Sequence, residues 1–119
     1  MDTPTAETAW NIDGRLWICL GNKVQIGKGK IELLEKTGHL GSLRKAAAEM
    51  KMSYRQAWQE IHQINQHPSG PAVILHRGGA LGGQATLTPF GKWLIDSYHQ
   101  VEIAFKVFKT EQKKKLRFP

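Results

Sequence analysis

Residues 53–66 carry polar side chains that form directed hydrogen bonds, where most surface helices would carry Glu and Lys. Arginine pairs with both major-groove acceptors of guanine, glutamine pairs with the donor and acceptor of adenine, and aromatic rings pack on thymine methyl groups. The side chains in this segment that suit such contacts are Ser53, Tyr54, Arg55, Trp58, Gln59 and His62. They favour a helix that reads base edges, although a polar, glutamine-rich face also occurs on ordinary surface helices.

The charge of the chain favours a polyanionic partner. Its 119 residues include 17 Lys and Arg against 10 Asp and Glu, which gives a net charge of +7. Three of the acids, Asp2, Glu7 and Asp13, precede the first basic residue, so the rest of the chain is more basic still. A surface of this kind attracts nucleic acid ahead of anionic membrane.

Other features of the composition indicate the class of protein. The single cysteine, Cys19, excludes an internal disulfide and fits a reducing compartment. No apolar run approaches the roughly 20 residues of a membrane span, and the acidic start is unlike a signal peptide. We therefore predict a soluble, cytoplasmic protein without membrane contact.

The segment before the polar helix predicts a helix-turn-helix. Ser42 is a natural N-cap for residues 43–50, where Leu43, Ala46, Ala47 and Met50 form one apolar stripe. A short break follows, and Ser53 caps the next helix, residues 53–66. In that helix Ala57, Ile61 and Ile64 fall on one face, which should pack inward. Free N–H groups at both helix starts suit phosphates, so the predicted phosphate contacts are Ser42, Arg44, Lys45 and Lys51.

A hairpin and a first helix are expected upstream. Residues 15–20 and 23–26 read as two strands joined by Gly21 and Asn22. Apolar periodicity then predicts a helix that begins near residues 27–30 and ends near Gly38. The glycines and lysines of residues 27–30 suggest a phosphate loop, but the GxxxxGK[ST] spacing is missing, so helix entry is favoured.

A second hairpin, a wing, is expected downstream. Residues 67–71 end the polar helix with two prolines and a glycine. Residues 72–76 and 85–88 are strand candidates around a glycine-rich loop whose glycines permit either a tight turn or a close approach to DNA. The predicted wing contacts are Arg77, Gly78, Gly79, Gly82, Gly83 and Gln84. We expect Trp58 to pack mainly against this wing, with an edge contact to DNA.

A long helix should begin at Thr88 and Pro89 and continue to the C-terminal lysines. Its apolar residues alternate in steps of four and three, as in a coiled coil, at Leu94, Tyr98, Val101, Phe105 and Phe108. The stripe could pack on the chain's own core, but a helix of this length extends beyond a small domain. We therefore predict a homodimer interface along it. The basic tail is expected to be solvated.

These elements define the predicted architecture and exclude some functions. The fold is mainly α with small β elements, a winged helix-turn-helix with an N-terminal β-hairpin and a long C-terminal dimerisation helix. The predicted divisions are a flexible segment 1–12, a DNA-binding domain 13–92, and a dimerisation helix with basic tail 93–119. The five histidines have no metal-ligand spacing with Cys, Asp or Glu, and no catalytic motif occurs. We expect no enzyme activity, cofactor or metal.

Two stretches, GSLRKAAAEMKMSYRQAWQEIHQIN and RGGALGGQATLTPFG, resemble the N-terminal winged-helix domain of ModE-type molybdenum-responsive regulators. The resemblance covers residues 15–108, includes Asn65, and extends more distantly to LysR-type DNA-binding domains. It implies a homodimer on a palindromic operator in double-stranded DNA, with helix 53–66 in the major groove and wing 77–84 beside it. It also implies dimerisation through the long helix, joined by the N-terminal hairpin.

The chain also departs from this family pattern. Full-length regulators of this type carry C-terminal oxyanion-binding modules, and this sequence stops at Pro119. We therefore expect a stand-alone DNA-binding form without molybdate sensing, whose wing contacts differ at Gln84. The alternatives are a winged-helix module that binds protein and an oxyanion-responsive accessory regulator.

Overall fold

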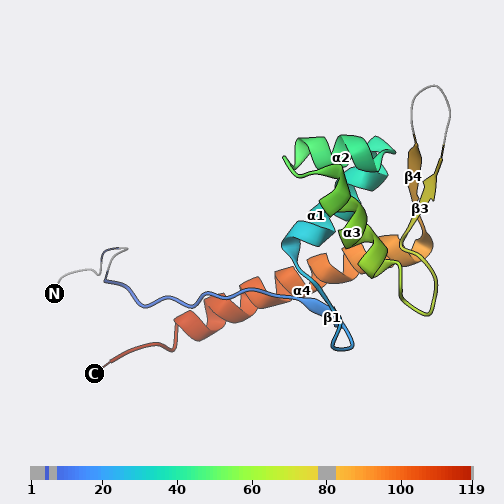
Figure 1. Ribbon diagram of the computed structural model, residues 1–119. Helices are drawn as coiled ribbons and strands as arrows, with labels where there is room; N and C mark the ends of the chain where they lie inside the picture. The colour runs from blue at the N-terminus through green and yellow to red at the C-terminus, as the bar shows by residue number, and fades with distance from the viewer. Residues whose placement is uncertain (1–4, 6–7, 78–82, 119) are drawn as a thin grey trace.

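The computed structural model describes Thr5, residues 8–77 and residues 83–118. Two hairpins and three short helices form a head, and the second half of a long fourth helix projects from it as an arm (Figure 1). The molecule is elongated, with a longest extent of 68 Å. The elements are β1 (Ile18–Leu20), β2 (Val24–Ile26), α1 (Lys28–Leu40), α2 (Leu43–Glu49), α3 (Tyr54–Ile64), β3 (Val73–His76), β4 (Gln84–Leu87) and α4 (Pro89–Lys113). The predicted class, mainly α with small β elements, is confirmed.

Both predicted hairpins are present. Strands β1 and β2 pair antiparallel, with Ile18 opposite Ile26, and Gly21 takes a positive φ of 55° in the turn. Strands β3 and β4 pair antiparallel, with Val73 opposite Leu87 and His76 opposite Gln84. Because side chains alternate along a strand, Val73 and Ala85 face the core while Ile74 and Thr86 face outward.

The predicted end of the first helix is wrong by two residues. Helix α1 continues through Gly38 to Leu40, and Gly41 ends it with φ 66° while its N–H donates to Thr37 O at 2.9 Å. The reason is a tertiary contact: a Cβ at Gly38 would overlap the Leu87 side chain of β4. The glycine therefore marks where the wing packs on α1, and it does not mark a helix terminus.

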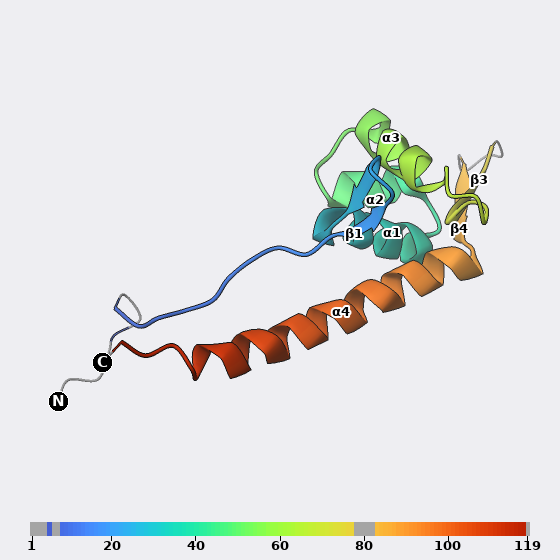
Figure 2. The ribbon, with the colours of Figure 1, turned by 90° about the horizontal axis from the view of Figure 1, so that it is seen from below.

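The core lies where α1, α2 and α3 meet (Figure 2), and both hairpins contribute buried side chains to it. Ala46, Ala47 and Ala57 are buried between the helices, and their small side chains let α2 and α3 approach α1 closely. The larger buried side chains are Ile26, Ile31, Leu33, Leu34, Ile61, Ile64, Val73 and Leu94.

Helix α4 begins as predicted. Thr88 caps it by accepting the Gly91 N–H at 3.1 Å, and Pro89 occupies the first turn. Gly91 is buried against the wing, because a Cβ there would overlap the Ala72 carbonyl oxygen. Over the residues that the structure describes, no helix combines the length and the apolar character that a bilayer span needs.

The predicted coiled-coil seam divides into two parts. Leu94 and Tyr98 are only 0% and 3% exposed, because they pack in the head's own core. Val101 and Phe108, in the arm, are 43% and 52% exposed, and Phe105 is half-buried. The first two positions are thus occupied within one chain, and only the last three remain for a partner helix.

A histidine between two carboxylates ties the arm to α1. His99 Nε2 lies 2.8 Å from Oε1 of Glu35 on α1, and His99 Nδ1 lies 2.9 Å from Oε1 of Glu102 on α4. Only the doubly protonated imidazolium donates through both nitrogens. The hydrogen bonds to Glu102 and then to Glu35 raise the pKa of His99 above its usual value, against a smaller opposing effect of burial.

The raised pKa of His99 makes this link dependent on pH. When the pKa of a group is higher in the folded state than in the unfolded state, its protonated form stabilises the fold. This stabilisation is complete at a pH below the unfolded-state pKa and is lost as the pH rises through the folded-state pKa. We expect His99→Gln to lower the free energy of unfolding most below pH 6.5, the unperturbed pKa, and least at alkaline pH. Urea unfolding followed by tryptophan fluorescence across a pH series measures this. His76→Gln, at an exposed strand position, is the control. An equal loss at every pH would contradict the link.

Candidate nucleic-acid interface

The turn between α2 and α3 is set by backbone hydrogen bonds at the end of α2. Lys51 takes a positive φ of 55°, unusual for a residue with a side chain. The Met52 N–H donates to Ala47 O at 3.0 Å and the Lys51 N–H donates to Ala48 O at 3.1 Å. This is the Schellman arrangement, which satisfies the last carbonyls of a helix and turns the chain sharply. A short, sharp turn therefore joins α2 to α3, at the place where the sequence predicts a break between two helices.

The two predicted serine caps are confirmed as caps. Ser42 Oγ accepts the Lys45 N–H, and Ser53 Oγ accepts the Gln56 N–H, each at 3.1 Å. Each hydroxyl keeps its own hydrogen as a donor, and helix starts of this kind attract anions. Their phosphate contacts remain a prediction.

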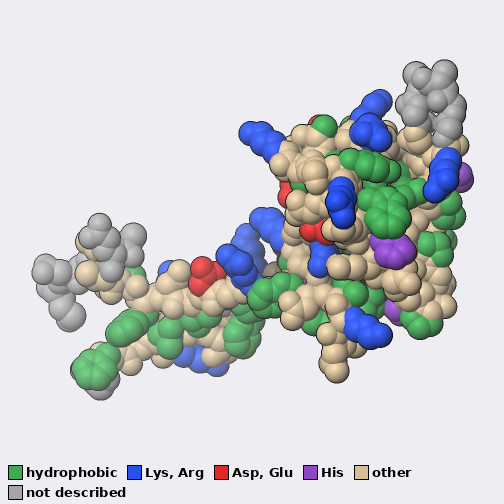
Figure 3. Space-filling model, viewed as in Figure 1, with side chains coloured by type: hydrophobic (Ala, Val, Ile, Leu, Met, Phe, Trp, Pro, Cys, Tyr) green, Lys and Arg blue, Asp and Glu red, His purple; other side chains and the backbone are tan. Residues whose placement is uncertain are grey.

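Helix α3 divides into two faces, as its periodicity predicts. Ala57, Ile61 and Ile64 are buried against the head. Five of the six predicted DNA-contacting residues of this segment, Tyr54, Arg55, Trp58, Gln59 and His62, lie on α3 and are exposed; the sixth, Ser53, is its cap. Figure 3 shows Lys and Arg side chains around this part of the head. The exposed face is thus free to meet a large partner.

A cleft of about 900 Å³ separates α3 from the wing. Three arginines from three elements reach it: Arg44 of α2, Arg55 of α3 and Arg77 after β3. Among the residues that the structure describes, no carboxylate lines it; the others there are Leu43, Tyr54, Trp58, Leu75, His76, Gly83 and Gln84. The cleft, which we call the wing cleft, therefore offers positive charge and aromatic surface together.

One pair in the wing cleft was not foreseen from the sequence. The Arg44 guanidinium carbon lies 4.4 Å from the centroid of the Tyr54 ring. A cation over a ring is attracted by the ring's quadrupole, so α2 orients the first residue of α3. Arg44 thus contacts Tyr54 directly, whereas the sequence predicted it only as a phosphate contact.

Trp58 lies differently from the expectation. Its ring stacks on His62 of the same helix, with centroids 4.8 Å apart and planes 10° from parallel. The side chain remains 42% exposed at the wing cleft, which it lines with Leu75 and His76 of β3. The stack forms because Trp58 and His62 are one helical turn apart. It leaves the outer part of the Trp58 ring accessible, whereas packing on the wing would cover that part.

The wing residues are only partly described. Arg77 is exposed at the end of β3, and Gln84 begins β4. A Cβ at Gly83 would lie 2.8 Å from the His76 carbonyl oxygen, so glycine is required there for the two strands to approach. The predicted contacts Gly78, Gly79 and Gly82 lie outside the described residues.

The predicted phosphate contacts do not form one cluster. Arg44 lines the wing cleft, whereas Lys51 lines a second groove across α3 from it. Lys45 is exposed on α2 and lines neither. The basic surface therefore extends to both sides of α3.

Asn65 joins the end of α3 to the wing. Its Oδ1 accepts the Ala72 N–H at 2.8 Å and the Val73 N–H at 3.2 Å, while its Nδ2 donates to Val73 O at 2.9 Å. Through these three bonds the side chain fixes the start of β3 relative to α3. An asparagine directly before the proline- and glycine-containing loop is the only sequence signal of this role.

Removing the Asn65 amide should loosen the wing. Asn65→Ala leaves two N–H groups and one carbonyl of a partly buried segment without their partner, which costs about 1–3 kcal/mol in the free energy of unfolding. Asn65→Asp keeps both acceptor bonds and should lose less. Denaturant unfolding gives the free energies, and amide exchange at Val73 reports on the wing. Gln66→Ala is the control, since the Gln66 side chain bonds to His62 of α3 and does not reach the wing. Equal stability of Asn65→Ala and this control would contradict the assignment.

Curated proteins similar to this chain have names connected with molybdenum. The chain is 37% identical over 78 residues to the molybdenum-pterin-binding protein MopB of Rhodobacter capsulatus, which covers 66% of this chain and 29% of that protein. It is 34% identical over 77 residues to the molybdenum transport protein ModE of Azotobacter vinelandii, or 65% of this chain and 28% of that protein.

A third relative is named as a DNA-binding protein. The chain is 34% identical over 83 residues to the DNA-binding transcriptional dual regulator ModE of Escherichia coli, which covers 70% of this chain and 32% of that protein. No protein-family model matches the chain. The chain thus spans about a third of the length of the relatives that it matches. It is similar to molybdenum-binding proteins and transcriptional regulators, and these names do not describe enzymes.

Proposed function

We propose that the chain binds double-stranded DNA as a homodimer and acts as a sequence-specific transcriptional regulator. The wing cleft carries the proposal. Three arginines and two aromatic residues meet beside an exposed helix whose inner face is fixed in the core. A guanidinium group recognises either a phosphate or the acceptor pair of guanine, and an α-helix fits the major groove of B-form DNA.

The placement of α3 and the wing supports two kinds of contact with DNA, one to the bases and one to the sugar-phosphate backbone. In this proposal the N-terminal half of α3 enters the major groove with Tyr54, Arg55 and Gln59, while Arg77 and the wing reach the neighbouring backbone. Phosphate contacts fix orientation, and base contacts fix sequence. Asn65 holds the two elements in register, because its side chain bonds from the end of α3 to Ala72 and Val73 at the start of β3.

The arm supports the dimer. Val101, Ile103, Val107 and Phe108 are exposed, and their spacing along the helix makes the arm apolar on more than one side. An apolar helix that projects into water needs a partner, and a second copy related by a twofold axis supplies it. Such a dimer would present two α3 helices to the two halves of a palindromic operator.

A recognition-helix variant tests the base contacts. Arg55→Ala should lose about 1–3 kcal/mol of discrimination between operator and scrambled duplex, the usual contribution of a bidentate base pair contact, and Tyr54→Ala should also weaken operator binding. Fluorescence anisotropy with a duplex selected from a random pool measures both. Lys92→Ala, an exposed cation near the start of α4, removes the same charge and should retain discrimination. Parental affinity of both α3 variants would contradict the recognition-helix assignment.

The alternative is a winged-helix module that binds another protein. It shares the fold but has no need for a carboxylate-free cleft lined by three arginines. Absence of binding to any duplex at low salt would favour this module over a DNA-binding regulator.

The relatives' names suggest the regulated process. We propose that the chain acts in a regulatory system that concerns molybdenum. Selection of protein-bound fragments from sheared genomic DNA should then enrich fragments next to genes for molybdenum uptake or molybdenum-cofactor synthesis. Arg55→Ala, run in parallel, should lose this enrichment. Enrichment of unrelated loci by the parent chain would contradict the proposed process while leaving DNA binding in place.

A further inference from the structure

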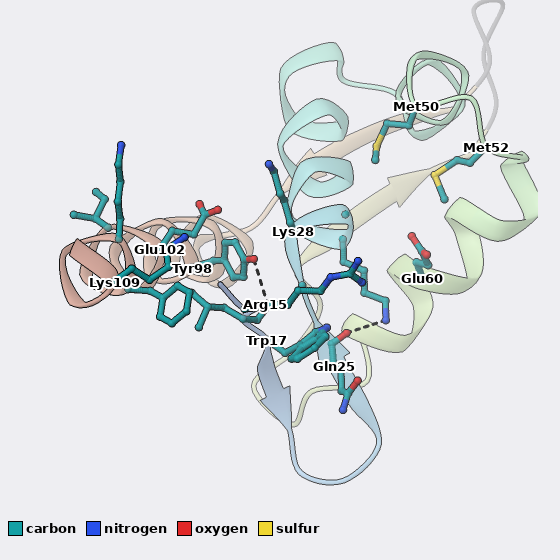
Figure 4. A pocket seen from close by; sticks show the side chains of 18 of the residues that line it. Arg15, Trp17, Gln25, Lys28, Met50, Met52, Glu60, Tyr98, Glu102 and Lys109 are labelled. Carbon is teal, nitrogen blue, oxygen red and sulfur yellow. Dashed lines mark hydrogen bonds between the residues drawn. The ribbon is translucent and has the colours of Figure 1, made fainter. Parts of the chain in front are cut away.

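A second groove lies on the side of α3 away from the wing. It measures about 1200 Å³ and is bounded by residues 14–17, the start of α1, the α2–α3 turn and the arm. Figure 4 shows Lys28 on α1 facing Lys109 and Glu102 on α4 across it, with Arg15 and Trp17 along the floor and Met52 and Glu60 on the α3 side. We call it the basic groove.

Positive charge predominates in the basic groove. Of the described residues, six that line it are cations, Arg15, Lys28, Lys30, Lys51, Lys106 and Lys109, and two are carboxylates, Glu60 and Glu102. Glu102 is already hydrogen-bonded to His99, and a raised pKa keeps that histidine charged at higher pH. The charges come from several separate elements, which suits an extended anion better than a single small one.

The start of α1 adds to this charge. Gly27 caps the helix in an extended conformation with no side-chain hydrogen bond, and no acidic residue occurs in the first turn. The first N–H groups of a helix carry a partial positive charge and can donate hydrogen bonds to an anion. The space around Gly29 is unoccupied: beyond its own helix backbone, no atom lies within 4 Å of where a Cβ would stand. The helix start thus faces open space next to Lys28.

The basic groove is continuous with the proposed DNA-binding face. Lys51, at the α2–α3 turn, and Gln56 and Glu60 of α3 line it. Gln56 also donates its N–H to the cap of α3, Ser53. Figure 3 shows basic side chains on the head and again where the head meets the arm, on the same face of the molecule. A duplex lying along α3 therefore passes both the wing cleft and the basic groove.

We infer that the basic groove holds a second stretch of DNA sugar-phosphate backbone, on the opposite side of α3 from the wing. This inference rests on the proposed DNA-binding function. The groove lies between α3 and the arm, so in a dimer joined through the arms it would lie toward the partner copy and would contact the central part of the operator. Lys28 and Lys106 approach the phosphates from opposite walls. Contacts of this kind add affinity without sequence preference.

The salt dependence of binding measures these contacts. The logarithm of the binding constant falls with the logarithm of salt concentration by about 0.9 for each phosphate neutralised. Lys28→Gln combined with Lys106→Gln should therefore flatten the slope on a random-sequence duplex by about 2. Lys23→Gln combined with Lys92→Gln removes the same charge from exposed positions outside both grooves and should keep the parental slope.

Gly29 offers a variant that separates binding from folding. Gly29→Glu places a carboxylate in the groove, where it repels phosphate, while an acidic residue in the first turn stabilises a helix. We expect a melting temperature at or above that of Gly29→Ala, together with a severalfold weaker duplex affinity. Gly29→Ala fills the same space without charge and should bind as the parent does.

The results distinguish this inference from the proposed function. Parental slope and affinity for the groove variants, with weak binding by Arg55→Ala, would overturn the groove contact alone. Parental binding by Arg55→Ala as well would overturn both. A parental slope accompanied by an altered oligomeric state in sedimentation would assign the groove to contacts between copies of this chain and would also overturn the inference.

Discussion

The backbone of residues 71–73 connects α3, the wing and α4, which together place the proposed interface and the arm. The Asn65 side chain binds the Ala72 N–H from the end of α3, and the Thr88 N–H donates to the Ala72 carbonyl at 3.0 Å from the start of α4. The Thr88 hydroxyl lies 2.7 Å from Pro71 O. Because these hydrogen bonds join the three elements through one short stretch of backbone, α3, the wing and α4 keep a fixed relation. The wing cleft and the direction of the arm both depend on it.

Helix α4 has two roles because its burial changes along its length. Its first three turns complete the core through Leu94, Ile95 and Tyr98. Beyond the His99 link to Glu35 the helix leaves the head, and its apolar residues are exposed. The helix extends this far because its own backbone hydrogen bonds continue to Lys113. The arm then becomes the surface on which a partner is most needed.

The charge of the chain is organised around α3. The wing cleft on one side has three arginines and no described carboxylate, and the basic groove on the other side has six cations. The planar guanidinium group of arginine suits hydrogen bonds of fixed direction, whereas the ammonium group of lysine acts as a point charge that binds phosphate at many angles. The arrangement accounts for the excess of basic residues in a protein whose core is ordinary.

The sequence by itself determined the local elements, because caps and periodicity act within a few residues. Ser42, Ser53 and Thr88 fix where helices begin, and the spacing of Ala57, Ile61 and Ile64 fixes the buried face of α3. Only the tertiary structure decided contacts between residues far apart in the chain. Gly38 serves packing against Leu87, Leu94 and Tyr98 belong to the core, and His99 reaches Glu35. No local pattern encodes such contacts, since each depends on the geometry of the whole head.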